Sequence, residues 1–142
     1  MLALSGDTAA AYRQGAQAVA LAPELWATHA FLGCAYLFGG RPANAVPELR
    51  RAVSLDSNVT LFTGILAYAD ARAGHSDDAR QLVAGLDAKA RRGAGSPAGV
   101  AIGYLGLGDS ARALEWFERA ARERDQLLLA IGLTPAWFDS IR

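Results

Sequence analysis

The stretch GYLGLGDSARALEWFERAA, residues 103–121, places a glycine and an aspartate between two runs of residues that favour helix. The glycine at this break is Gly108, and glycine also stands at Gly74, Gly40 and Gly6, so one glycine recurs every 34 residues. A glycine can adopt the left-handed backbone conformation that ends a helix. The interval therefore predicts a unit of helix, tight turn and helix that is repeated along the chain.

Other sequence columns repeat at the same interval. An alanine follows each glycine of the series by five residues, and a small residue precedes the last three glycines by seven. Short side chains allow two helices to cross closely, so we expect the alanines to lie at such crossings. The alanine column is Ala11, Ala45, Ala79 and Ala113, and the small-residue column is Gly33, Ala67 and Ala101.

Asp70 departs from its column, in which the neighbouring copies carry Tyr36 and Tyr104. One hypothesis is a buried carboxylate with a function. The other is an aspartate at the helix edge that meets water or pairs with an arginine such as Arg72 or Arg80. The second is favoured because carboxylates inside proteins are normally paired.

A 34-residue period of helix, turn and helix resembles the tetratricopeptide repeat. The resemblance implies an all-α fold, a right-handed α-α superhelix of helix-turn-helix repeats closed by a C-terminal capping helix. It is looser at the proline that usually ends the family's repeat, which is present only as Pro23 and is replaced later by Ser57. The residues that carry it are Leu32, Gly33, Tyr36, Gly40, Ala45, Leu49 and Ala52, then Leu66, Ala67, Gly74, Ala79 and Val83, then Val100, Ala101, Tyr104, Gly108, Ala113, Phe117 and Ala120.

The repeat layout predicts one domain over residues 1–142. A half repeat without its usual first helix comes first, which suggests a piece of a longer array or an end that must be covered. We expect Asp7, Ser76 and Asp109 to cap the helices that follow the turns, and AKARRGAGSPAG, residues 88–99, to form the one irregular loop. The predicted parts are the half repeat 6–25, the repeats 26–59, 60–93 and 94–127, and the cap 125–142.

Composition excludes several classes of function. Hydrophobic residues make up 52% of the 142, which indicates a folded chain, and Lys+Arg and Asp+Glu both number 14. A net charge of zero gives no electrostatic basis for binding nucleic acid or an anionic membrane. No apolar run approaches the roughly 20 residues that span a bilayer, and the start does not resemble a signal peptide. The cytoplasm is therefore the expected location.

The sequence offers little catalytic chemistry. The two histidines, His29 and His75, have no second metal ligand at a helix-face spacing with Cys34, so no metal or cofactor is expected. We expect His29 to be partly buried and His75 to be exposed. No set of serine, histidine and aspartate can be argued, so no catalytic residue is predicted.

The resemblance implies that the first helix of each pair lines a concave surface where ligands bind. Three hypotheses account for an apolar lining: a partner segment lies in the groove, a second copy of the chain covers it, or the small side chains let the helices close up. The predicted groove residues are Cys34, Leu37, Phe38, Tyr68, Arg72, Ile102 and Leu105, with Ala27, Ala30, Leu61, Gly64, Ala71 and Ala98 around them.

The predicted function is a non-catalytic module that binds a protein or peptide partner, or itself, through this groove. A homodimer could form through the N-terminal half repeat or through the groove. The run from Gly108 to Arg142 resembles the C-terminal repeat arrays of bacterial signalling proteins, namely kinases, nucleotide cyclases and winged-helix regulators, which implies an accessory or regulatory role. The alternatives are a small-molecule-binding helical protein and a structural spacer in a longer chain.

Overall fold

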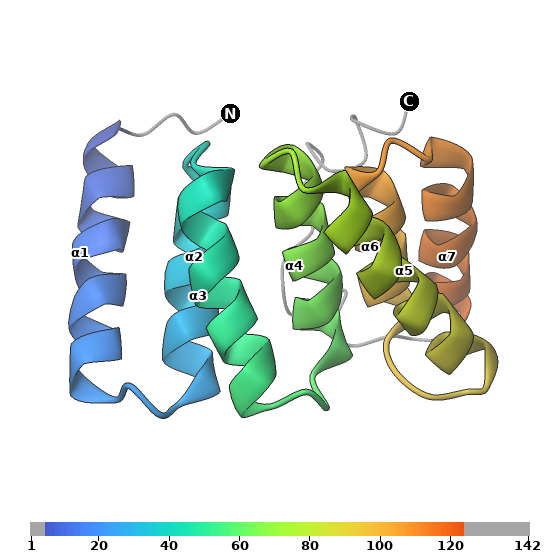
Figure 1. Ribbon diagram of the computed structural model, residues 1–142, viewed down its shortest axis with the longest axis horizontal. Coiled ribbons are helices and arrows are strands. Elements are labelled where there is room, and N and C mark those ends of the chain that lie inside the picture. The colour runs from blue at the N-terminus through green and yellow to red at the C-terminus, as the bar shows by residue number, and fades with distance from the viewer. Residues whose placement is uncertain (1–4, 124–142) are drawn as a thin grey trace.

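The computed structural model describes residues 5–123, which form seven α-helices and contain no strand. The predicted all-α fold is confirmed. In Figure 1 the helices follow one another along the long axis of the molecule, from α1 at one end to α7 at the other. The helices are α1 (Ser5–Leu21), α2 (Trp26–Phe38), α3 (Pro42–Leu55), α4 (Thr60–Arg72), α5 (Ser76–Arg91), α6 (Pro97–Gly106) and α7 (Ser110–Arg122).

Each helix packs mainly on its neighbours in the sequence, as the arrangement of a helical-repeat solenoid requires. The hairpins are α2 with α3, α4 with α5, and α6 with α7, while α1 packs on α2. The exception is the contact between α4 and α6, which joins the first helices of two successive hairpins. The predicted division into repeats stays a prediction, and the predicted cap 125–142 lies outside the residues that the structure describes.

Three of the four glycines in the 34-residue series end helices as predicted. The φ angles of Gly40, Gly74 and Gly108 are +80°, +92° and +81°. The amide that follows each of them donates to a carbonyl oxygen five residues earlier, at 2.7–3.0 Å. This is the bond that closes a helix end after a left-handed residue. The turn expected at Gly6 is wrong, because α1 begins at Ser5 and its alanine-rich sequence favours helix from there.

The predicted helix caps are partly correct. The Asp109 side chain accepts a hydrogen bond from the Arg112 amide at 3.1 Å. Ser76 is not a cap, because it is the first residue of α5 and follows His75. Asp7 lies inside α1.

The irregular loop is shorter than predicted. Helix α5 continues to Arg91 because alanine, lysine and arginine favour helix, which leaves residues 92–96 between α5 and α6. The Ser96 side chain then caps α6 by accepting from the Gly99 amide at 3.2 Å, and Pro97 is the first residue of that helix.

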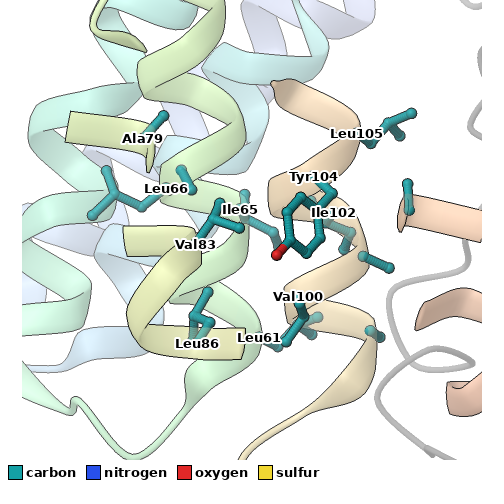
Figure 2. Packing of buried hydrophobic residues seen from close by; sticks show 14 of the residues in the cluster. Leu61, Ile65, Leu66, Ala79, Val83, Leu86, Val100, Ile102, Tyr104 and Leu105 are labelled. Carbon is teal, nitrogen blue, oxygen red and sulfur yellow. The ribbon is translucent and has the colours of Figure 1, made fainter. Parts of the chain in front are cut away.

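The repeated small residues lie inside the core. Ala45, Ala79 and Ala113 are completely buried, which confirms that short side chains occupy the interior between the helices. At Gly33 an added Cβ would lie 2.6 Å from Cγ of Leu49, so only glycine fits against α3 there. In Figure 2 the side chains of Ile65 and Val83 lie in the space between α4, α5 and α6, on the same side as Tyr104.

Helices α4 and α6 approach to backbone contact. An added Cβ at Gly64 would lie 2.1 Å from the carbonyl oxygen of Gly99, and one at Gly106 would lie 2.6 Å from Cα of Tyr68. Real Cβ atoms do not come this close to backbone. The hypothesis that small residues let the helices close up therefore describes the interface between these two helices.

A hydrogen-bonded acid lies at the junction of α5 and α6. The Tyr104 hydroxyl donates to Oδ2 of Asp87, and Nε of Arg91 donates to Oδ1. Burial alone would raise the pKa of Asp87, but these hydrogen bonds and the charges of Arg91 and Arg112 outweigh it and hold the pKa below its ordinary value. Burial, followed by the bond to Asp87, raises the pKa of Tyr104.

We expect Gly64→Ala to lower the free energy of unfolding by about 1–3 kcal/mol, because the new methyl group must push α6 away from α4. The matched control is Gly85→Ala in α5, where nothing lies within 4 Å of an added Cβ. There alanine is the better helix former, so we expect a gain of about 0.5–1 kcal/mol. Urea unfolding followed by circular dichroism measures both, and a Gly64→Ala protein as stable as the parent contradicts the backbone contact.

Tyr104→Phe should lower the free energy of unfolding at pH 7 by about 1–2 kcal/mol, because it removes a hydrogen bond to a charged group. A carboxyl group whose pKa is lowered by folding stabilises the fold above its unfolded pKa of about 4, and this contribution is lost as the pH falls through the folded pKa. The deficit of Tyr104→Phe relative to the parent should therefore shrink when unfolding is measured at progressively lower pH.

The control for this measurement is Tyr36→Phe, at the equivalent position two copies earlier, where the ring packs on Tyr12 with centroids 4.9 Å apart. Its deficit should stay constant with pH over the same range. A Tyr104→Phe deficit that does not change with pH would show that Asp87 gains nothing from the tyrosine hydroxyl.

Candidate functional site

The structure places the predicted groove residues on α2, α4 and α6 but exposes them unequally. Residues of α6 lie deepest, since Ile102 is completely buried and Leu105 is 7% exposed. A partner cannot reach buried side chains without moving the helices around them. The exposed members are Phe38 and Arg72, the half-buried members are Cys34 and Tyr68, and the buried members are Leu37, Ile102 and Leu105. Their role in binding stays a prediction.

Three of the predicted residues line one cavity. Leu37, Tyr68 and Arg72, together with Gly40 and Pro42, surround a cavity of about 370 Å³ between the end of α2, the turn into α3 and the last turn of α4. Nη2 of Arg72 donates to the Tyr68 hydroxyl at 2.9 Å, and the guanidinium lies 5.0 Å from the centre of the tyrosine ring. The cavity therefore has an apolar wall and a positive charge held in place at its rim.

Helix α2 also carries two exposed aromatic side chains. Phe31 is 50% exposed and Phe38 is 53% exposed. They are seven residues apart, so they lie on the same side of the helix, two turns from each other. Phe31 was not among the predicted groove residues, which held its neighbour Ala30 at this turn of the helix, and Ala30 is 2% exposed. The pattern of Ala27, Phe31, Cys34 and Phe38 carries the correct helical spacing.

Cys34 lies on this side of α2 and is a packing residue. It is a half-buried free cysteine that packs against the hydrophobic core. Burial raises the pKa of its thiol to about 12. The nucleophilic thiolate is therefore scarce at neutral pH, as expected for a cysteine whose role is packing.

Asp70 is buried and paired, but not with the arginines that the sequence suggested. Its side chain is 1% exposed, and Oδ1 lies 3.3 Å from Nη2 of Arg50 and 3.2 Å from Nδ1 of His75. Arg72 bonds to Tyr68 and Arg80 bonds to Asp77. Pairing with an arginine is correct, but the partner comes from α3, and only the packing of hairpins brings α3 to Asp70.

A second cavity opens beside Asp70. It has a volume of about 580 Å³ and lies where α3, α4 and α5 meet. Its lining residues are Arg50, Val53, Ser54, Leu66, Asp70, Asp78, Gln81 and Leu82.

Three side chains of metal-ligating types lie together at the turn from α4 to α5, a grouping that helix-face spacing did not predict. One ligand atom from each of Asp70, His75 and Asp78 lies within 4.8 Å of the other two. The sequence analysis looked for ligands along one helix, whereas these three converge across the turn from α4 to α5. The histidine five residues after one aspartate and three before another was the signal that could have found them.

The other histidine, His29, makes two hydrogen bonds within the protein. His29 is buried more completely than the partial burial that we expected; its Nε2 donates to the carbonyl oxygen of Pro23 at 2.8 Å, and Nδ1 lies 2.7 Å from Oε2 of Glu48. These bonds tie the start of α2 to α3 and to the segment before it, so His29 serves the fold.

Comparison with known proteins identifies the repeat. The tetratricopeptide repeat family model matches residues 27–59, which hold nearly all of α2 and all of α3. No curated protein and no solved structure gives a significant match to the chain. Within residues 5–123, no helix combines the length and the hydrophobicity needed to cross a bilayer. The match identifies the α2–α3 hairpin as similar to a tetratricopeptide repeat, and the stacking of the hairpins in order agrees with a helical-repeat solenoid.

Proposed function

We propose that this protein is a non-catalytic interaction module that binds a segment of a partner protein across α2 and α4. Tetratricopeptide repeats generally mediate protein–protein interaction, and the family match covers the α2–α3 hairpin that forms one side of this surface. The proposal thus assigns the general activity of the family to a particular part of the chain.

The observation that carries the proposal is the pair of half-exposed phenylalanines on α2, together with the cavity at the end of that helix. Phe31 and Phe38 present two large apolar rings on one face of α2, and the cavity that Leu37, Tyr68 and Arg72 line lies between the last turn of α2 and the last turn of α4. Large apolar groups exposed together mark interaction sites, and aromatic residues and arginine dominate binding energies at interfaces. A partner segment that inserts an apolar side chain into the cavity and offers an oxygen acceptor to Arg72 fits this chemistry.

The packing of α4 against α6 supports a binding surface that is limited to the first two hairpins. Gly64 and Gly99 close the space between these helices, and Ile102 and Leu105 lie buried behind that contact. Of the seven predicted groove residues, we therefore assign direct binding to Phe38, Tyr68 and Arg72, the wall of the cavity to Leu37, and the core to Cys34, Ile102 and Leu105.

We further propose an accessory or regulatory role in bacterial signalling in the cytoplasm. Its support is the resemblance of the run from Gly108 to Arg142 to the C-terminal repeat arrays of bacterial signalling proteins, a run whose last part lies outside the described residues.

Self-association is the second candidate function, because exposed leucines flank the joint between α1 and α2. Leu21 is 87% exposed and Leu25 is 49% exposed. A second copy that covered these side chains would remove apolar surface from water. Sedimentation equilibrium distinguishes the two functions: a monomer supports the partner module, whereas a dimer that dissociates in the Leu21→Ser, Leu25→Ser double variant supports self-association.

The partner-binding proposal is tested with peptides selected for binding from a random displayed library. For a selected peptide, Phe38→Ala and Tyr68→Ala should each raise the dissociation constant by about tenfold or more, the effect of losing about 1.4 kcal/mol or more at an interface. Isothermal titration calorimetry measures the affinity, and circular dichroism should show unchanged helix content.

Leu114→Ala is the control, because Leu114 is a comparable exposed residue (45%) on α7, away from this surface. It should leave the dissociation constant unchanged. The surface assignment is wrong if the selected peptides bind Phe38→Ala and Tyr68→Ala as tightly as the parent protein.

A further inference from the structure

Two equivalent positions change together between successive hairpins. In the last hairpin Tyr104 of α6 lies under Arg112 of α7, with the guanidinium 5.5 Å from the ring centre. The residues 34 positions earlier are Asp70 of α4 and Asp78 of α5. An aromatic ring and a cation are thus replaced by two acids. The cavity of about 580 Å³ between α3, α4 and α5 lies at this position, and both aspartates line it.

The replacement leaves the carboxylate of Asp70 buried, with hydrogen-bond partners for only one of its two oxygens. Oδ1 of Asp70 is shared by Arg50 and His75, both of whose side chains are about half exposed. Oδ2 is buried and has no hydrogen-bond partner among the residues that the structure describes. Leaving a charged oxygen buried without a partner opposes folding, and the tyrosine of the neighbouring hairpins avoids this cost. The fold alone therefore does not account for Asp70.

Asp70 and two nearby side chains are of types that ligate metals. His75 comes from the turn between α4 and α5, and Asp78 comes from the first turn of α5. One ligand atom each from Asp70, His75 and Asp78 lies within 4.8 Å of the others. Zinc binds nitrogen and oxygen ligands at about 2.0–2.2 Å, so two ligands of one ion lie at most about 4.4 Å apart, and a small movement of the exposed Asp78 and His75 side chains would bring all three within that limit.

We propose that Asp70, His75 and Asp78 bind one divalent transition-metal cation of the Zn²⁺ class. An imidazole with two carboxylates suits zinc and its first-row neighbours, whereas magnesium prefers oxygen ligands and retains water. Nδ1 of His75 supplies its lone pair with the proton on Nε2, so the cation replaces the hydrogen bond from His75 to Asp70. The Oδ2 atom of Asp70 supplies the second ligand, and water completes the coordination.

The charges at the site favour a cation despite the nearby arginine. Asp70 and Asp78 carry two negative charges against the single positive charge of Arg50, which approaches only Oδ1 of Asp70 and whose side chain is 57% exposed. A bound cation would link the end of α4 to the start of α5. The cavity beside Asp70 shares no lining residue with the cavity of the proposed partner surface, so the two proposals can be tested independently.

The test is titration of the whole chain with Zn²⁺ by calorimetry and with Co²⁺ by visible absorption, using Mg²⁺ as the selectivity control. We expect one Zn²⁺ per chain, Co²⁺ bands in the visible range that Zn²⁺ abolishes, and no response to Mg²⁺. Asp78→Asn and His75→Gln should each weaken Zn²⁺ binding by at least about tenfold, the lower limit for disturbing a metal site.

Asp77→Asn is the matched control. It removes the same charge from the adjacent residue, whose side chain is 93% exposed and pairs with Arg80 outside the cluster. It should bind Zn²⁺ as the parent does. Because Asp78 is exposed, Asp78→Asn should fold normally, which circular dichroism without metal verifies. The proposal is overturned if the parent binds neither Zn²⁺ nor Co²⁺, if Asp78→Asn binds as tightly as the parent, or if Asp77→Asn weakens binding equally.

Discussion

The contact between α4 and α6 is the constraint on which the rest of this molecule depends. Gly64 and Gly99 bring the two backbones together, and no side chain larger than hydrogen fits at Gly64 without moving a helix. The contact joins the second hairpin to the third and buries Ile102 and Leu105. Ile102 and Leu105, the predicted groove residues of α6, are buried, whereas the exposed members of the predicted set, Phe38 and Arg72, lie on α2 and α4.

The repeat separates residues that build the fold from residues that depart from it. Ala45, Ala79 and Ala113 build the fold, because each is completely buried in the small space between two helices at equivalent positions of the repeat. Asp70 is different, since it occupies a column where Tyr104 makes a hydrogen bond that stabilises the fold, and it leaves a cavity and an unpartnered oxygen in exchange. A repeat protein supplies its own reference for such a comparison, because neighbouring copies show what the fold alone requires.

The candidate site was predicted less well than the fold, for reasons of geometry. Helical spacing identified α2 as the exposed apolar helix, but a shift of one residue, about 100°, is enough to exchange the buried Ala30 for the exposed Phe31. The pairing of Asp70 with Arg50 could not be predicted from spacing within one helix, because the two residues come from successive hairpins. The cluster of Asp70, His75 and Asp78 was overlooked for the same reason, since a turn separates its members.

The sequence by itself determined the all-α fold, the left-handed glycine turns and the small residues at helix crossings. Each of these depends on local backbone preference or on side-chain size at a fixed interval, and both properties can be read directly from the sequence. Only the tertiary structure decided that α4 and α6 touch, that Ile102 is buried and that Arg50 meets Asp70. These facts depend on the angle and distance at which one hairpin packs on the next, and those are set jointly by many side chains far apart in the sequence.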